Sequence, residues 1–326
     1  MLFQDINNFI NENQSFLITS HIEPDGDAIG SELSMAIQLE KMSKRVFIIN
    51  PEPVPKRYRF LRRWKDIEIK KPRQNIRIDA SIFLDVGNTK RVSWIFDFVK
   101  EKGIPILNID HHVSNSLYGD INYVDKEASS TSECIFDIFK ALGIKLNGEI
   151  CECIATGIIT DTGRFSFKNT SEKTFRVCAE LSCCGVDFSS LSNYIYNKRS
   201  IESVRLLSSV LSTIKVIEGI AFVQLTQRMI KESGAGEEES EGFVNYVLAI
   251  GNIKSAVFFR EKSNGEIRVS LRSKDETINV NRIASIFNGG GHSQAAGFRS
   301  FKSMKELELE ILIAFQNIET KRDCSD

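Results

Sequence analysis

The chain has 326 residues and a formal net charge of -1 at pH 7, with 42% hydrophobic and 26% charged residues. This length suits two domains, and the composition is that of a soluble globular protein. Because no overall positive charge draws in long nucleic acid, duplex DNA is not an expected partner, whereas a small anion held by a few local cations remains open.

The sequence predicts a cytoplasmic protein without a membrane partner. No apolar run approaches the roughly 20 residues needed to cross a bilayer. The first 15 residues contain no Lys or Arg, so they lack the basic start of a secretory signal. The seven cysteines are an odd number and form no CxxC repeat, which indicates reduced thiols that are mostly buried as small apolar side chains.

The first half of the chain alternates short apolar runs with helical patterns. Strands are expected at residues 16–19, 46–49, 80–84 and 104–109. Helices are expected at residues 27–42, 92–100 and 132–142. This rhythm predicts an α/β domain with a mostly parallel sheet covered on both faces.

The second half predicts a change of domain. Residues 150–196 look mainly helical, and a connecting helix is expected at 201–213. Further strands are expected at residues 214–216, 221–226, 256–260 and 267–272, and 234–241 is expected to be a loop. The expected organisation is a first domain over 1–190, a linker helix over 191–212, and a smaller α/β domain over 213–326.

The first expected strand leads into a histidine and two aspartates. His21, Asp25 and Asp27 follow it, around Pro24 and Gly26. Loops at the carboxyl ends of strands form the ligand crevice of an open α/β sheet. A helix N-cap explains Asp27 but leaves His21 and Asp25 unexplained.

Three further segments deliver acids or imidazoles in the same way. Asp85 directly follows a buried strand, the next strand ends in Asp110, His111 and His112, and an apolar helix breaks at Asp161. A charge placed after a buried strand is costly unless it is paired or binds a metal. Together with the segment after the first strand, these segments contain three of the four histidines of the chain.

The donor set favours transition metals. A mixture of carboxylates and imidazoles suits Mn²⁺ and related ions better than Ca²⁺. Two such ions lie about 3.5–4 Å apart in hydrolytic sites and share a bridging carboxylate. Asp85, alone at its strand end, is the candidate for this bridge.

These segments together resemble a known family. The motifs His21-x-x-Pro-Asp25-Gly-Asp27, Asp85, Asp110-His111-His112 and Gly157-Ile-Ile-Thr-Asp161-Thr-Gly163 resemble, in order, those of the DHH phosphoesterase family. The stretch from Phe287 to Phe298 resembles the glycine-rich motif of the DHH-associated C-terminal domain. The likeness covers nearly the whole chain and is strongest to the bacterial nano-RNase and 3′-phosphoadenosine 5′-phosphate (pAp) phosphatase group.

The resemblance implies a cofactor and a substrate class. It implies two Mn²⁺ ions, hydrolysis of very short single-stranded RNA to mononucleotides, and conversion of pAp, a phosphorylated nucleotide, to AMP. One ion would be held by His21, Asp25 and Asp85. The other would be held by Asp27, Asp85, His111 and Asp161.

It also implies roles for the remaining residues of the DHH motif. His112 would contact the scissile phosphate and protonate the leaving oxygen, so His112 and Asp85 are the expected catalytic residues. Asp110 would orient a ligating histidine.

The expected substrate contacts lie in the second domain. Gly289, Gly290 and Gly291 expose backbone N–H groups to a phosphate, and His292 adds a donor. Arg272 would bind a second phosphate with its guanidinium. The resemblance implies an active site in the interdomain cleft, where only short anions fit.

Several alternatives stay open. A cyclic or linear dinucleotide phosphodiesterase would use the same site. A single-strand DNA exonuclease of this family carries an added module for which the chain has no room, and the manganese pyrophosphatases lack the glycine-rich histidine motif. A non-catalytic nucleotide sensor would have lost metal ligands, and none is lost here.

Two features are not decided by the sequence. The basic and aromatic segment 56–65 is more typical of an amphipathic surface helix with its aromatics in the core than of a base-stacking surface. Neither a monomer nor a homodimer is favoured.

Overall fold

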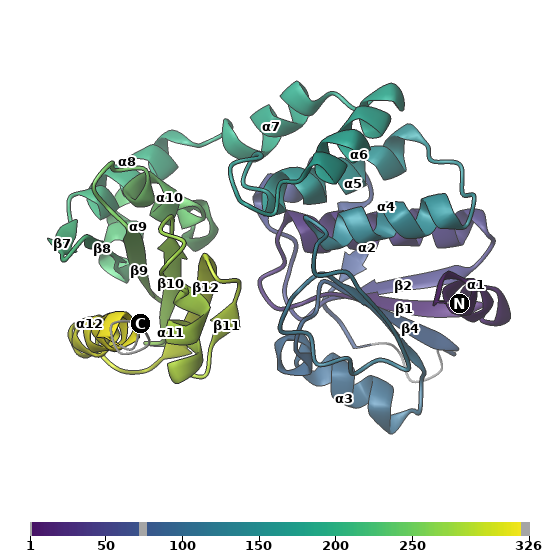
Figure 1. Cartoon of the computed structure of the whole chain (residues 1–326), viewed down its shortest axis with the longest axis horizontal. Helices are drawn as coiled ribbons and strands as arrows, with labels where there is room; N and C mark the ends of the chain where they lie inside the picture. Colours follow the sequence, from purple (N-terminus) through teal and green to yellow (C-terminus); the bar gives the residue numbers. More distant parts are fainter. Residues whose placement is uncertain (1, 72–76, 321–326) are drawn as a thin grey trace. The chain divides into compact units, whose positions relative to one another are not determined.

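The chain folds into two units, each built on its own sheet. The computed structural model describes residues 2–71 and 77–320. The two compact units are Met1–Lys198 and Arg199–Asp326. They are drawn from purple to teal and from green to yellow in Figure 1. The division falls within the range 190–212, where the sequence indicates a change of domain.

The first unit contains a six-stranded parallel sheet with the order β3-β2-β1-β4-β5-β6. Its strands are β1 (Ser15–Thr19), β2 (Arg45–Ile49), β3 (Ile67–Glu68), β4 (Ala80–Leu84), β5 (Ile106–Asp110) and β6 (Ile121–Val124). The four strands and the α/β class expected from the sequence are confirmed. The two edge strands β3 and β6 were missed because they are too short to show a periodic pattern.

Helices cover both faces of this sheet. They are α1 (Leu2–Glu12), α2 (Gly26–Lys41), α3 (Trp94–Glu101), α4 (Thr131–Ala141), α5 (Gly148–Asp161), α6 (Glu172–Cys183) and α7 (Phe188–Tyr196). Figure 1 shows α3 on the opposite side of the sheet from α2 and α4. Along β1, Phe16 and Ile18 join the core under α2, whereas Leu17 joins the core under α3. This two-sided burial explains why the strands read as continuous apolar runs.

Two glycines allow α2 and α5 to pack backbone against backbone. A Cβ atom at Gly30 would lie 2.3 Å from the carbonyl oxygen of Cys153. A Cβ atom at Gly157 would lie 1.9 Å from Ser132 Oγ and 2.6 Å from Asp27 Oδ1. The close approach of these helices therefore depends on glycine and places Asp27 beside the N-terminus of α4.

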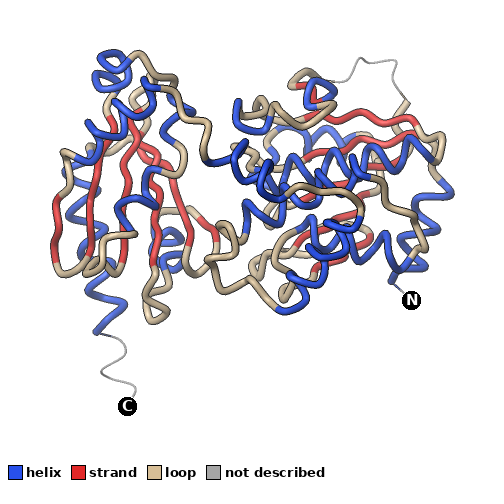
Figure 2. The backbone as a smooth tube through the Cα atoms, turned by 90° about the horizontal axis from the view of Figure 1, so that it is seen from above, coloured by secondary structure: helices blue, strands red, loops and turns tan. Residues whose placement is uncertain are grey.

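The second unit contains a six-stranded mixed sheet with the order β11-β12-β10-β9-β8-β7. Its strands are β7 (Lys215–Ile217), β8 (Ile220–Leu225), β9 (Ser255–Glu261), β10 (Ile267–Ser273), β11 (Gly290–Gly291) and β12 (Ala295–Ser300). Only β8 and β9 pair in parallel, and the other neighbours are antiparallel. The tube in Figure 2 shows these strands side by side with helices on either side of them.

The helices of the second unit enclose two separate cores. They are α8 (Ile201–Leu211), α9 (Gln227–Ser233), α10 (Phe243–Leu248), α11 (Val280–Ile286) and α12 (Met304–Thr320). One core joins α11 and α12 to Val269 and Leu271 of β10. The other joins α8 and α10 to Phe258 of β9.

Two expectations about local structure are wrong. The segment 56–65 forms no α-helix but two 3₁₀ turns, η1 (Lys56–Tyr58) and η2 (Trp64–Asp66), although the aromatic Tyr58 is buried as expected. The expected loop 234–241 contains a further 3₁₀ turn, η4 (Glu237–Ser240). Among the described residues, no helix has the length and apolar character required to cross a membrane.

Candidate active site

The predicted site residues of the first unit follow three neighbouring strands. His21 comes two residues after β1, Asp85 directly follows β4, and His111 directly follows β5. Because β1, β4 and β5 are adjacent and parallel, their carboxyl ends lie at one edge of the sheet. The side chains of His21, Asp85 and His111 are each at most 5% exposed.

The loop after β1 is fixed by Asp25, which is the N-cap of α2. Asp25 Oδ1 accepts hydrogen bonds from the backbone N–H groups of Asp27 (3.0 Å) and Ala28 (3.1 Å). The sequence analysis placed Asp27 at this cap, and that assignment is wrong, since Asp27 lies in the first turn of the helix. Because Asp25 caps α2, the carboxylate of Asp27 is not needed at the N-terminus of that helix.

The carboxylate of Asp27 is held instead by the N-terminus of α4. Its two oxygens accept hydrogen bonds from the backbone N–H groups of Thr131 (2.6 Å) and Ser132 (2.8 Å). Burial, followed by the negative charge of Asp85, raises the pKa of Asp27 to about 7. The sequence analysis missed Thr131 and Ser132, because backbone donors carry no residue-type signal.

Asp85 lies at the centre of the cluster. Its Oδ2 is 3.1 Å from His21 Nε2, and its Oδ1 is 3.7 Å from His111 Nε2 and accepts a hydrogen bond from Thr131 Oγ1 (3.1 Å). Burial would raise the pKa of Asp85, but the hydrogen bond with His21 and the charges of His112, His21 and His111 together hold it well below the usual range. The backbone of Asp85 has a φ of 60°, a left-handed conformation that costs a non-glycine residue about 1–3 kcal/mol and is typical of functional sites.

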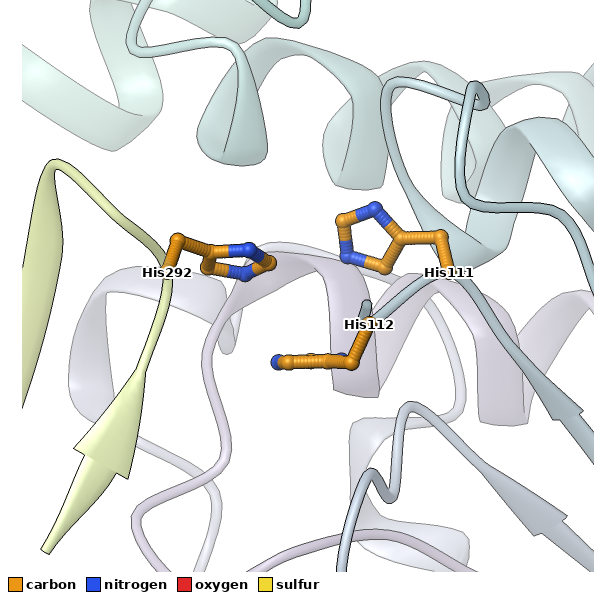
Figure 3. Close-up of side chains that lie close together, drawn as sticks. All are labelled: His111, His112 and His292. Atoms are coloured by element: carbon orange, nitrogen blue, oxygen red, sulfur yellow. The ribbon is translucent and has the colours of Figure 1, made fainter. Parts of the chain in front are cut away.

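The two imidazoles of the DHH motif have different partners. Figure 3 shows the side chains of His111 and His112, which follow β5, and that of His292, which belongs to the second unit. The ring centroids of His111 and His112 are 5.0 Å apart. His111 Nδ1 lies 3.2 Å from the carbonyl oxygen of Ala128. When Nδ1 donates to this carbonyl, the Nε2 lone pair faces the carboxylates of the cluster.

Asp110 orients His112. Asp110 Oδ1 lies 2.7 Å from His112 Nδ1, and Asp110 Oδ2 accepts a hydrogen bond from Asn115 Nδ2 (2.6 Å). The imidazole that Asp110 contacts is that of His112, the histidine expected to meet the phosphate, whereas the role of Asp110 in orienting a ligating histidine stays a prediction. Burial acts against the charged form of His112, but the charge of Asp110 and its hydrogen bond raise the pKa of His112 above the usual value. Asn115 is a further residue that the sequence analysis missed.

Asp161 joins the cluster from the end of α5. Its Oδ2 lies 3.2 Å from His111 Nε2. Burial and the negative charge of Asp27 raise the pKa of Asp161 well above the usual value. Burial is the larger cause of both shifts and neighbouring carboxylates add to it, so a divalent cation at this cluster would favour the charged forms of Asp27 and Asp161.

The first unit offers three overlapping groups of possible metal ligands. Ligand atoms of His21, Asp25 and Asp85 lie within 4.8 Å of one another, and so do those of Asp27, Asp85 and His111 and those of Asp85, Asp110 and His112. Asp85 belongs to all three groups, and the first two share only this residue, as a bridging carboxylate requires. The donors are carboxylate oxygens and imidazole nitrogens, so these residues could hold divalent cations.

One cation of the first unit also lies at this edge of the sheet. Arg91, in the 3₁₀ turn η3 (Thr89–Val92), places Nη2 3.0 Å from His21 Nδ1, and its carbonyl oxygen accepts a hydrogen bond from the backbone N–H of Ile22 (2.7 Å). The sequence analysis missed Arg91. Its position six residues after Asp85 in the same loop was the available signal.

The predicted phosphate-binding residues of the second unit lie together at one end of its sheet. Arg272 of β10 pairs with Ala295 of β12, and the backbone N–H of His292 donates to the carbonyl oxygen of Ala295 (2.8 Å) in the adjoining turn. Arg272 and His292 are therefore neighbours in space within this unit.

The three positions before His292 are glycine for different reasons. A Cβ atom at Gly289 would lie 2.3 Å from the carbonyl oxygen of Gly297, and one at Gly291, which has a φ of 143°, would lie 2.4 Å from that of Ala295. Both glycines are explained by packing against β12. A Cβ atom at Gly290 would meet nothing within 4 Å, so packing does not explain this glycine.

A parallel sheet that gathers carboxylates and imidazoles at its strand ends, followed by a second domain with a glycine-rich turn, defines the DHH class of phosphoesterases. The family model described as the DHH family, N-terminal domain, matches residues 15–158, and the DHHA1 domain matches residues 219–316. The chain belongs to the DHH family. It is a hydrolase that acts on ester bonds.

Individual relatives resemble nearly the whole chain. The protein named "Bifunctional oligoribonuclease and PAP phosphatase NrnA" from Thermus thermophilus is 33% identical over 299 residues, which cover 90% of this chain and 85% of that protein. The protein of the same name from Bacillus subtilis is 32% identical over 290 residues, covering 87% and 88%. The crystal structure of an exopolyphosphatase-related protein from Bacteroides fragilis superposes with a TM-score of 0.88 at 30% identity and covers 97% of both chains.

Proposed function

We propose that this protein is a cytoplasmic, manganese-dependent phosphoesterase that hydrolyses short oligoribonucleotides to mononucleotides and pAp to AMP. The observation that carries the proposal is the position of Asp85, whose two oxygens face His21 and His111 and which belongs to both sets of ligand atoms. The names of the two NrnA relatives support the substrate class. Short single-stranded RNA and phosphorylated nucleotides are the proposed partners, and duplex DNA is not.

The proposed cofactor is a pair of Mn²⁺ ions. We assign His21, Asp25 and Asp85 to one ion, and Asp27, Asp85, His111 and Asp161 to the other. When bound, two such ions lower the pKa of a water molecule and offset the negative charge of the phosphoryl group in the transition state. Their positive charge also removes the mutual repulsion of Asp27 and Asp161, whose pKa values are raised without them.

The proposed role of His112 is that of a general acid. Its Nδ1 is held by Asp110 at 2.7 Å, so a charged imidazole carries its second proton on Nε2. The raised pKa of His112 favours the charged form that carries this proton. Nε2 can then donate to the oxygen of the departing nucleotide.

The proposed substrate contacts of the second unit are Arg272, His292 and the backbone of Gly289, Gly290 and Gly291. Arg272 offers a planar fork of donors that suits phosphate. Gly290 is the position where the backbone is accessible and packing sets no demand for glycine. These features support a phosphate site at this end of the second sheet.

The experiment that tests this function is a substrate panel with Mn²⁺. It comprises pAp, RNA of two to ten nucleotides, cyclic and linear dinucleotides, and pyrophosphate. We expect turnover of pAp and of the shortest RNAs, with activity that falls steeply with length. Turnover of cyclic dinucleotides alone, or of pyrophosphate alone, would replace the proposal with one of the alternatives.

Asp85→Ala is the control for the same panel. Because Asp85 is shared by both ligand sets, its loss removes several kcal/mol of transition-state stabilisation, or at least about 10³-fold in rate. Asp97→Ala, at an exposed position of α3, is the matched variant that should keep wild-type activity. Retained turnover in Asp85→Ala would contradict the assignment of the site.

A further inference from the structure

Three arginines lie side by side across the second sheet. Arg268 of β10 pairs directly with Arg260 of β9 on one side and with Arg299 of β12 on the other. Directly paired residues of antiparallel strands project from the same face of a sheet. We call Arg260, Arg268 and Arg299 the arginine row.

The arginine row is an unfavourable arrangement for the protein alone. Like charges placed directly opposite each other on neighbouring strands destabilise a sheet. Burial and the positive charge of Arg299 lower the pKa of Arg268 to about 10. Burial likewise lowers the pKa of Arg260, with a further contribution from Arg299. Burial is the larger cause of both shifts, and the positive charge of Arg299 adds to it.

Acidic groups lie around the row. Glu266 Oε2 lies 3.8 Å from Arg268 Nε, at the long end of an ion pair. Glu241 and Glu237 act on Arg260 through their charge, but Glu237 forms a closer pair with Lys262 at 2.8 Å. Arg260 Nη2 donates to Ser270 Oγ (3.1 Å), whereas Arg260 Nε is buried with no hydrogen-bond partner among the described residues. A buried donor of this kind calls for an acceptor.

A track of small residues connects the arginine row to Arg272. Along β10, residues alternate between buried and half-buried, so Arg268, Ser270 and Arg272 share one face. On β12, the residues paired with Ser270 and Arg272 are Gly297 and Ala295. Four residues of strand span about 13 Å. This face thus carries arginines at both ends, with small residues of β10 and β12 between them and Phe258 and Ala256 of β9 on the other side of the track.

We propose that the arginine row binds a backbone phosphate of an oligoribonucleotide that extends from Arg272 along β10. This inference rests on the proposed function, and it deepens it by assigning the part of the molecule that recognises RNA as a chain. Several guanidinium groups around one anion relieve their mutual repulsion and form charge-assisted hydrogen bonds. pAp carries its phosphates on a single nucleoside and leaves the row unused, so the row distinguishes oligonucleotides from pAp.

The test compares variants of the row on two substrates. Arg268→Gln and Arg299→Gln remove one charge each while keeping a polar side chain of similar length. Arg282→Gln is the matched control, because Arg282 is an exposed arginine of the same unit on α11, which packs on the other face of the sheet. We expect kcat/KM for a five-nucleotide RNA to fall about tenfold in each row variant, the effect of one charge-assisted hydrogen bond. We expect kcat/KM for pAp to stay within about twofold of wild type in all three variants.

A binding measurement separates this inference from the proposed function. The affinity of the full-length protein for a fluorescein-labelled five-nucleotide RNA is measured by anisotropy in EDTA, where no hydrolysis occurs. We expect Kd to rise about tenfold in the row variants, and the slope of log Kd against log salt concentration to fall by about 0.7 for each lost contact. Row variants that bind this RNA as tightly as wild type, or that lose pAp turnover to the same extent, would overturn the inference. If the wild-type protein binds this RNA through the row in EDTA but does not hydrolyse it when Mn²⁺ is supplied, only the proposed function is overturned.

Arg299→Glu guards against misfolding as an explanation. Arg299 is exposed, and the new carboxylate would lie opposite Arg268 in the paired strands. We expect a melting temperature equal to or above that of wild type, together with weaker RNA binding than in Arg299→Gln. Unchanged RNA affinity in this stably folded variant would also overturn the inference.

Discussion

The two sheets of this molecule concentrate charges of opposite sign by different geometric means. In the first unit, parallel strands end at one edge, so acids and imidazoles from β1, β4 and β5 meet there. In the second unit, arginines meet across the middle of a sheet through antiparallel register. The first arrangement suits small cations, and the second suits the phosphates of a substrate.

The comparison teaches that charge crowding points to a ligand most clearly when the protein itself does not relieve it. Asp27 and Asp161 have raised pKa values, and Arg260 and Arg268 have lowered ones. In each case the shift is toward the neutral form of the side chain. A divalent cation in the first unit and a phosphate in the second would reverse these shifts.

The largest expected effect concerns His112, the second histidine of the DHH motif. His112→Gln removes the proposed general acid, so kcat should fall by about 10²–10⁴-fold. The loss should be smaller for a substrate with a nitrophenyl leaving group, which needs no proton. Kinetics on pAp and on a nitrophenyl phosphate ester measure this difference, and equal losses on both substrates would show that His112 is not the acid.

The next largest effect concerns Glu32, a buried acid that the metal ligands do not include. Glu32 of α2 is fully buried and accepts a hydrogen bond from Asn50 Nδ2 (2.9 Å), and burial raises its pKa from 4.5 to about 8. Since the folded pKa lies above the unfolded one, the stability present at pH 4–5 is lost as the pH rises through about 8. A difference of this size corresponds to at most about 5 kcal/mol.

Glu32→Gln removes this titration. In urea unfolding with EDTA, the variant should gain stability relative to wild type as the pH is raised from 5 to 9. Glu12→Gln, at an exposed position of α1, is the control and should show no such trend. Parallel pH profiles for wild type and Glu32→Gln would mean that Glu32 ionises normally and belongs with the charged acids.

The third prediction concerns Gly157, which allows the close backbone approach of α5 to its neighbours in the first unit. Gly157→Ala places a Cβ atom 1.9 Å from Ser132 Oγ and 2.6 Å from Asp27 Oδ1, so α5 must move away from α4 and α2. Overpacking of this kind costs about 1–3 kcal/mol. Thermal unfolding should show the loss, and Mn²⁺ affinity should fall because Asp27 is displaced. Gly148→Ala, at the start of the same helix, leaves 3.6 Å to its nearest neighbour and should be neutral; equal stability of the two variants would contradict the account.

The smallest effect concerns the cation within the acidic region. His21 Nδ1 lies 2.7 Å from the carbonyl oxygen of Ile22 and 3.0 Å from Arg91 Nη2. When Nδ1 donates to Ile22, Arg91 has no acceptor on the ring and can bind substrate phosphate.

Arg91→Ala should therefore raise KM for pAp about tenfold, with the Mn²⁺ concentration for half-maximal activity unchanged. Lys90→Ala is the neighbouring control. A shifted Mn²⁺ requirement with normal kinetics at saturating Mn²⁺ would show instead that Arg91 only positions His21.

Much of the first unit could be predicted from the sequence because its strands are buried on both faces. Continuous apolar runs located β1, β2, β4 and β5, and β1, β4 and β5 led into residues whose charge or imidazole had no structural reason to be there. The edge strand β3 and the helix α1 gave weaker signals. The N-cap was assigned to Asp27 instead of Asp25, because both residues are aspartates with a small residue between them.

The supporting contacts could not be predicted. Thr131 and Ser132 act through backbone N–H groups, and Asn115 through an amide that reaches Asp110 from five residues away. The arginine row depends on strand register between β9, β10 and β12, which a single sequence does not reveal. Arg272 was proposed from its place at the end of the expected strand 267–272.

The most direct test of the central claim is to locate Mn²⁺ in crystals of the protein by anomalous diffraction at the manganese edge. The account predicts two peaks about 3.5–4 Å apart, both in contact with Asp85, one beside His21 and the other beside His111. A single peak, or manganese bound away from Asp85, would contradict it.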